Sequence, residues 1–67
     1  MISDFIRYEY TPGDDTVFNR FAIISVALDG VVVEIYTKGD ENPYEFRYSS
    51  EGDAARDFEK FTRELLW

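Results

Sequence analysis

Residues 23–36 read IISVALDGVVVEIY, a run of aliphatic and β-branched side chains with Asp29 and Gly30 at its centre. Such runs are typical of β-strands, and an Asp-Gly pair between apolar segments is a strong signal for a two-residue hairpin turn. We therefore predict a type I′ turn at Asp29-Gly30, with Leu28 opposite Val31. This hairpin decides the fold, because its register determines which side chains form the core.

The predicted register divides the hairpin into two faces. One face is almost wholly apolar and is expected to form the core, with Val26 opposite Val33 and Ile24 opposite Ile35. The other face is expected to point away from the core and to mix polar with apolar residues. Its apolar members, counting one residue just upstream, are Phe21, Ile23, Val32 and Tyr36.

Further strand-like segments flank the hairpin. Residues 4–10 and 44–49 alternate between apolar and polar side chains, which is the period of a half-buried strand. Residues 11–16 and 38–43 read TPGDDT and KGDENP, and these residue types are typical of turns. The patterns predict four strands, at about residues 4–10, 17–28, 31–38 and 44–49.

The C-terminal segment carries the pattern of one amphipathic helix at about residues 51–66. Ser50 is a suitable N-cap, and acidic residues follow in the first turn, where the helix dipole favours negative charge. Apolar residues then recur at steps of four, three and four, which places them in one stripe. The stripe consists of Ala54, Phe58, Phe61 and Leu65. The charged residues of this segment, including Asp57, are expected to face solvent.

Together these patterns predict a single compact domain over residues 1–67, of the α+β class and with two layers. A four-stranded antiparallel β-meander would pack one face on the C-terminal α-helix, in the order ββββα. The sheet would contribute to the core Ile6, Tyr8, Ile24, Val26, Leu28, Val31, Val33, Ile35, Phe46 and Tyr48. The helix would add Phe58, Phe61 and Leu65.

The composition argues against several classes of function. The chain has no cysteine and no histidine, so it lacks disulfides, thiolate ligands and the side chain that most readily titrates near neutral pH. No serine or lysine has an evident activating base, and one sheet under one helix offers no evident cleft. We therefore expect no enzyme activity, catalytic residues, cofactor or metal centre. The absence of cysteine and of a long apolar run favours a cytoplasmic protein without membrane contact.

The charge is strongly unbalanced, since fourteen acidic and seven basic residues give a net charge of −7. Direct nucleic-acid binding requires clustered Lys and Arg, so we expect none, and the field of the chain instead favours basic partners. In a meander, the loops at residues 11–16 and 39–43 emerge at the same end of the sheet. The carboxylates that this would gather, and that we predict to bind the partner, belong to Asp14, Asp15, Asp40 and Glu41.

The leading hypothesis is a small acidic, non-catalytic protein-binding module that docks on a basic surface of a partner protein. One form of it is an inhibitor that occupies the groove of a nucleic-acid-binding protein as a nucleic-acid mimic. In size and composition, the chain resembles the small acidic phage and plasmid proteins that block restriction or CRISPR effectors, although it shares no motif with them.

Two alternatives remain open at the level of sequence. The apolar group Phe21, Ile23, Val32 and Tyr36 is a candidate homodimer or subunit interface, unless Met1-Ile2 or Trp67 covers it. The loop carboxylates are also compatible with a calcium-binding domain, because calcium prefers oxygen ligands. The chain contains no EF-hand loop motif.

Overall fold

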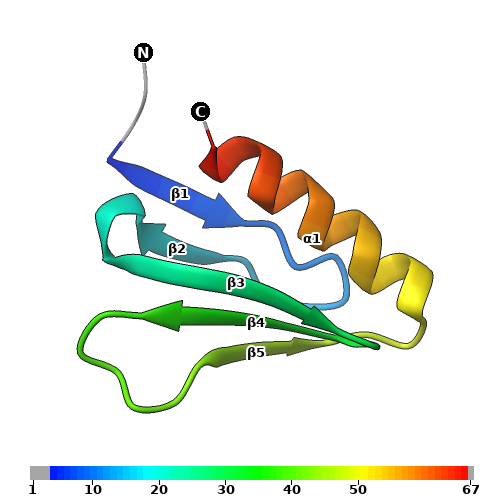
Figure 1. Cartoon of the computed structure of the whole chain (residues 1–67). Helices are drawn as coiled ribbons and strands as arrows, with labels where there is room; N and C mark the ends of the chain where they lie inside the picture. Colours follow the sequence, from blue (N-terminus) through cyan, green and yellow to red (C-terminus); the bar gives the residue numbers. More distant parts are fainter. Residues whose placement is uncertain (1–3, 67) are drawn as a thin grey trace.

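The computed structural model describes residues 4–66 and confirms the α+β class (Figure 1). The covering roles considered for Met1, Ile2 and Trp67 lie outside the described residues. The elements follow in the order β1 (Phe5–Tyr8), β2 (Thr16–Asn19), the 3-10 turn η1 (Arg20–Ala22), β3 (Ile23–Asp29), β4 (Val32–Thr37), β5 (Tyr44–Arg47) and α1 (Glu51–Leu65).

The strands form two antiparallel sheets instead of the single predicted meander. β1 pairs with β2 in one sheet, and β3, β4 and β5 form the other in that order. The strand predicted at residues 17–28 is therefore wrong, because η1 divides it into β2 and β3. Figure 1 shows these two strands pointing in opposite directions, so η1 reverses the chain.

The reversal at η1 has local and distant causes. The Asn19 side chain accepts a hydrogen bond from the Phe21 amide at 2.9 Å, which caps the turn. The Arg20 guanidinium donates to the carbonyl oxygens of Glu64 and Leu65 at 3.0 and 2.9 Å. Both carbonyls belong to the last turn of α1, where the usual amide partners four residues on are missing, so the turn also completes the helix terminus.

The β3–β4 hairpin turns one residue later than predicted. Asp29 pairs with Val32, so the two loop residues are Gly30 and Val31, and Leu28 is not opposite Val31. Gly30 has a φ of +62°, as a type II′ turn requires at its first central position. A type I′ turn at Gly30 and Val31 would need a positive φ at both residues, which a β-branched valine adopts only with strain.

A β-bulge at Ile24 changes the faces at the start of β3. Ile23 pairs with Thr37 and Ser25 with Tyr36, which leaves Ile24 as the additional residue. Ile23 packs against the core, whereas Ile24 is 64% exposed. The predicted core position of Ile24 and outer position of Ile23 are both wrong, because alternation along a sequence does not reveal an inserted residue.

The core lies where the inner faces of both sheets meet α1. Its buried apolar residues are Ile6, Tyr8, Phe18, Val33, Ile35, Phe46, Tyr48, Ala54 and Phe61. The rings of Tyr8 and Phe46 stack at 4.2 Å, and Phe61 meets Tyr8 edge-on at 5.1 Å. Leu28 and Val31 were predicted to be core residues, but Leu28 is near the hairpin turn and Val31 lies in it, and both are only partly covered.

The helix agrees closely with its prediction. The Ser50 hydroxyl accepts a hydrogen bond from the Asp53 amide at 3.2 Å, and α1 begins at Glu51. Ala54 and Phe61 of the apolar stripe are buried, and the rest of the stripe packs beside them. Within residues 4–66, no helix is long and apolar enough to cross a membrane.

Candidate functional site

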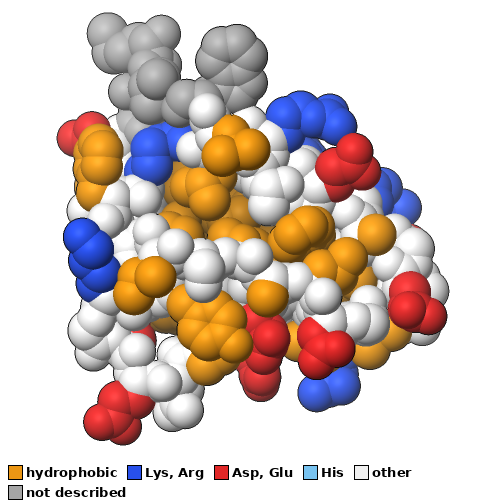
Figure 2. Space-filling model, viewed as in Figure 1, with side chains coloured by type: hydrophobic (Ala, Val, Ile, Leu, Met, Phe, Trp, Pro, Cys, Tyr) orange, Lys and Arg blue, Asp and Glu red, His pale blue; other side chains and the backbone are white. Residues whose placement is uncertain are grey.

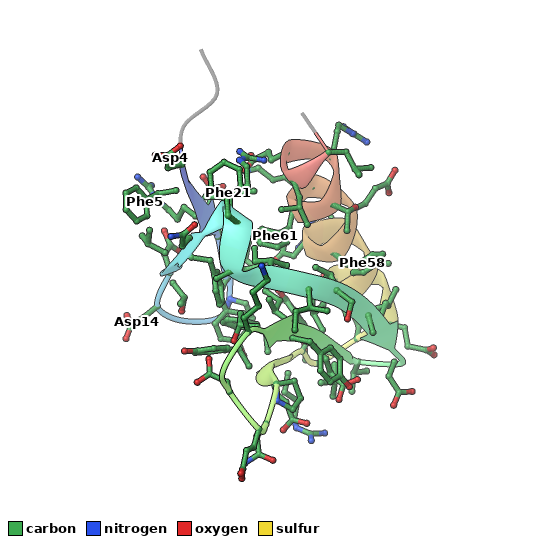
Figure 3. All side chains as sticks on the ribbon, turned by 60° about the vertical axis from the view of Figure 1, so that its left-hand side comes forward. Asp4, Phe5, Asp14, Phe21, Phe58 and Phe61 are labelled. Atoms are coloured by element: carbon green, nitrogen blue, oxygen red, sulfur yellow. The ribbon has the colours of Figure 1, made fainter. Side chains whose placement is uncertain are left out.

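The four loop carboxylates predicted to bind a partner do not meet. Because η1 reverses the chain, the loop after β1 and the loop after β4 emerge at opposite ends of the strands (Figure 1). Figure 3 shows Asp14 on the first of these loops, away from the loop of residues 39–43. The expectation that Asp14, Asp15, Asp40 and Glu41 form one acidic pole is therefore wrong. No group of three or more carboxylates suited to a metal ion occurs among residues 4–66.

Each half of that predicted set has its own surroundings. Asp15 lies 4.0 Å from the Arg7 guanidinium, and both side chains are largely exposed. Asp40 accepts a hydrogen bond from the Thr37 hydroxyl at 2.5 Å, which holds the start of its loop. That loop surrounds an open hollow of about 240 Å³, lined by residues 40–44. Two separated acidic loops produce a field over the surface but no single binding site.

The predicted apolar group is also dispersed. Phe21 lies on η1 and is 66% exposed. Ile23 packs against the core. Of this group, only Val32 and Tyr36 share the outer face of the three-stranded sheet, because they lie four residues apart on β4 and even spacings return to the same face.

The outer face of the β3-β4-β5 sheet carries two opposed carboxylates at its centre. Glu34 on β4 is directly opposite Glu45 on β5, and Ala27 flanks Glu34 on the β3 side. Directly opposed side chains in an antiparallel sheet have Cβ atoms about 5 Å apart, and like charges at that distance destabilise the pair. Among the described residues, neither glutamate forms an ion pair, so no direct contact with a cation offsets the repulsion.

Side chains of mixed character surround this pair. Along β4, Glu34 lies between Val32 and Tyr36, and Tyr36 is 38% exposed. Arg47 on β5 is opposite Val32, one row from the glutamates. We define the outer sheet face by these central residues: Ala27, Val32, Glu34, Tyr36, Glu45 and Arg47. The face combines an aromatic ring, small apolar groups, two opposed carboxylates and one guanidinium at its margin.

Unpaired negative charge extends over much of the remaining surface. Nine of the fourteen carboxylates form no ion pair within residues 4–66. They belong to Asp4, Asp14, Asp29, Glu34, Asp40, Glu41, Glu45, Glu51 and Glu64. Figure 2 shows acidic side chains along several edges of one view, around apolar groups.

A buried polar network connects α1 to both sheets, and the sequence patterns did not predict it. Asp57 is only 5% exposed, although its charge suggested the solvent side of the helix. Its carboxylate accepts hydrogen bonds from the Thr11 amide at 3.2 Å, the Thr11 hydroxyl at 3.1 Å and the Tyr48 hydroxyl at 2.8 Å. The Tyr48 and Tyr8 hydroxyls share a further bond of 2.5 Å. The spacing contained the signal, since Asp57 lies three residues after Ala54 and therefore on the buried side.

The protonation of this network indicates a structural role. Burial raises the pKa of Tyr8 to about 12, and burial with the bond to Tyr8 raises the pKa of Tyr48 further. Both phenols therefore stay neutral at physiological pH and hold their protons in hydrogen bonds. The recess beside Asp57 has a volume of about 10 Å³, space for about one water molecule. All buried side-chain polar atoms described here have partners, so the network is fully satisfied.

An exposed ion pair joins the end of β1 to the helix. The Lys60 ammonium donates to the Glu9 carboxylate, which lowers the pKa of Glu9 and raises that of Lys60. Both groups are exposed to solvent, so the pair adds little stability.

Comparison with protein-family models, with curated proteins and with solved structures found no match for this chain. The function must therefore be argued from the chain's own residues.

Proposed function

We propose that this protein is a non-catalytic binding module whose outer sheet face docks on a basic surface of a partner protein. The observation that carries the proposal is the pair Glu34 and Glu45, opposed at the centre of that face, neither of which forms an ion pair within residues 4–66. A protein selected only for stability would place opposite charges at this position. A lysine or arginine of a partner, placed between the two carboxylates, would convert the repulsion into attraction.

The surroundings of the pair support a protein as the partner. Tyrosine and arginine are enriched at protein interfaces, and both occur on this face as Tyr36 and Arg47. The half-buried Glu34 is held in place by its neighbours, so it loses less conformational freedom on binding than a loop carboxylate. The predicted acidic residues of the two loops then act at a distance, through a field that accelerates encounter with a basic partner.

In the nucleic-acid-mimic form of this proposal, the basic partner is a nucleic-acid-binding protein. A groove that binds nucleic acid offers several cations in a row, and the nine unpaired carboxylates of this chain would complement such a row. We place the docking contact on the outer sheet face, because there the carboxylates lie on regular strands and not on separate loops.

The experiment compares the wild type with a Glu34→Gln, Glu45→Gln double variant as immobilised bait. Binding proteins are captured from lysate of the source cells at about 50 and 500 mM salt, a range over which exposed charge pairs become screened. We expect the wild type to retain a basic protein at low salt and to lose it at high salt. The double variant should retain at least tenfold less, a difference of about 1.4 kcal/mol.

The matched control is Glu41→Gln with Asp14→Asn, which removes the same charge from the loops while leaving the outer sheet face intact. This variant should capture the same partner with slightly slower association. Equal capture by the Glu34 and Glu45 double variant, or capture that does not respond to salt, would contradict the proposal.

A further inference from the structure

The free edge of β3 offers a second surface, distinct from the outer sheet face. In the order β3-β4-β5, β3 is paired on one side only, and within residues 4–66 no backbone hydrogen bond joins its other side to any element. The closing pair of a two-residue hairpin is hydrogen-bonded, and such pairs alternate along the ladder. Asp29 and Ala27 therefore direct their backbone groups toward β4, whereas Leu28 and Val26 direct theirs outward.

This edge lacks the features that normally prevent strand addition. Edge strands are usually short, charged or interrupted by proline. The other edges conform: β1, β2 and β5 have four residues each, with Arg7 on β1 and both Glu45 and Arg47 on β5. β3 has seven residues, and its only charge is Asp29 at the end. Its bulge lies at Ile24, so the ladder from Ser25 onward is regular.

Apolar side chains continue from this edge onto the helix. On the side of the sheet that carries the core, β3 presents Val26, half-buried, and Leu28, 38% exposed. The flank of α1 next to its buried stripe carries Ala55, Phe58 and Thr62, all half-buried. Figure 2 shows apolar side chains in the band between β3 and α1 as Figure 1 places them. An added strand would therefore cover these side chains as well as satisfy the free backbone groups.

We infer that the β3 edge is a site of strand addition for an extended segment of a partner protein, with alternating apolar residues and a basic N-terminal end. Antiparallel addition is preferred because it is the more stable pairing. It places the N-terminal end of the added strand beside the C-terminal end of β3.

Charge complementarity determines which segment fits. Both Figures 1 and 3 place the start of α1 beside the β3–β4 turn, so Glu51 and Asp29 lie at the same end of the edge. Both are exposed, and neither forms an ion pair among the described residues. Lysine or arginine at the N-terminal end of the added strand would meet these two carboxylates. At the opposite end, Arg63 and the Arg20 guanidinium at the helix terminus disfavour a cation.

The test uses two peptides of identical composition, each with acetylated and amidated termini. One reads Lys-Lys-Val-Thr-Val-Thr-Val and the other Val-Thr-Val-Thr-Val-Lys-Lys. Each is titrated into the isotopically labelled full chain while backbone amide resonances are recorded. We expect the first peptide to bind at least about fivefold more tightly, a modest ratio suited to two exposed charge contacts. Shifts should be largest at Val26 and Leu28, whose amides should also exchange more slowly with solvent.

Four variants make the result specific. Ile24→Lys introduces a charge at an exposed edge position without emptying the core, and should weaken the first peptide about tenfold, because the uncharged C-terminal half of that peptide would have to cover the new ammonium group. Asp29→Asn with Glu51→Gln should abolish the preference between the two peptides, whereas Glu41→Gln, at the other end of the strands, should not. Glu34→Gln with Glu45→Gln should leave peptide binding unchanged, so failure of this inference is distinguishable from failure of the proposed function.

Three outcomes would overturn the inference. The first is an absence of shifts at millimolar concentrations of either peptide. The second is equal or reversed affinity of the two peptides, or shifts confined to Glu34, Glu45 and their neighbours. The third is a concentration-dependent increase in molecular size without peptide, with protection of the same amides, which would assign the edge to a second copy of the chain.

Discussion

β3 and β4 are the two strands of one hairpin, drawn from one apolar run of sequence, yet they have opposite environments. β4 buries Val33, Ile35 and Thr37, with Val33 and Ile35 fully covered. None of the seven residues of β3 is buried to that degree. Pairing and composition do not explain the difference, since both strands are rich in valine and isoleucine. The positions of the strands in the sheet explain the difference in burial. β4 is the central strand, whereas β3 is an edge strand at the border of the core.

The difference shows that apolar content and burial are separate properties in a small domain. A chain of 67 residues covers only about 60% of the surface that it exposes when unfolded, so some apolar strands must remain uncovered. Here the uncovered strand is the one with a free edge. The contrast between β3 and β4 can be tested by perturbing each strand and the groups that cover β4.

The largest expected effect comes from truncating the same residue type in each strand. Ile35→Ala removes a fully buried side chain and should lower the free energy of unfolding by about 2–5 kcal/mol. Ile24→Ala, at a 64% exposed position, should change it by less than about 0.5 kcal/mol. Urea unfolding followed by Trp or Tyr fluorescence measures both. Equal losses for the two variants would mean that β3 is covered in solution.

The second effect concerns the phenols that pack on the buried side of β4. The pKa of Tyr8 is about 12 in the folded protein and 10.0 for an ordinary tyrosine. Between pH 10 and 12 the unfolded chain loses this proton while the folded chain retains it. The contribution of Tyr8 to the free energy of unfolding should therefore be fully present below pH 10. It should fall by about 2 to 3 kcal/mol as the pH rises to 12.

The raised pKa of Tyr48 extends the same loss to higher pH. Thermal unfolding at a series of pH values measures the slope. Tyr8→Phe should be less stable near neutral pH, because it loses the bond to Tyr48, and its decline above pH 10 should be shallower. An unchanged slope in this variant would assign the alkaline transition to other groups.

The third effect tests the turn that connects the two strands. Gly30 has a φ of +62°, so Gly30→Ala should cost about 1 kcal/mol, although the added methyl group meets no atom within 4 Å. Gly52 provides the matched control, because it lies in the first turn of α1 with equally open space around it. Gly52→Ala should stabilise the protein by about 0.4–1 kcal/mol. Chemical denaturation of both variants would show opposite signs if the type II′ turn fixes the hairpin.

The smallest effect concerns the outer side of β4. Glu34→Gln removes half of the opposed carboxylate pair and should raise stability by about 0.2–1 kcal/mol at low salt. The gain should shrink as salt screens the pair in the parent protein. Glu41→Gln, on a loop without an opposed carboxylate, should have no comparable effect. If Glu34→Gln proved destabilising at every salt concentration, the two side chains would have to be relieving their repulsion within the molecule.

The sequence predicted much of this fold because local rules dominate in it. Ser50 and the stripe from Ala54 to Leu65 define the helix through capping and a period that tertiary contacts support. Asp29 and Gly30 located the hairpin to within one residue, but the turn type depends on strain at Val31, which alternation does not represent. The break at η1 was not predicted, because residues 17–28 contain only its local cap, Asn19, whereas the distant partners of Arg20 are the carbonyls of Glu64 and Leu65.

The candidate site was less accessible to sequence reasoning for the same reason. Glu34 lies opposite Glu45 because of the register between β4 and β5. The alternation of residues 44–49 predicts which face Glu45 is on, but not which residue of β4 it pairs with. The predicted union of Asp14 with Asp40 depended on an even number of strands between their loops. One unforeseen turn separated them. Local patterns therefore located the elements, and long-range contacts decided which surfaces face one another.

The hydrogen bonds between Arg20 and the end of α1 should form late in folding. It joins residues 44 and 45 positions apart, whereas the β3–β4 hairpin closes over a two-residue loop. Short closures cost little chain entropy, so the hairpin and helix should form before this connection. A contact made after the rate-limiting step slows unfolding without accelerating folding. Arg20 should thus slow unfolding and lengthen the lifetime of the native state, with little effect on the folding rate.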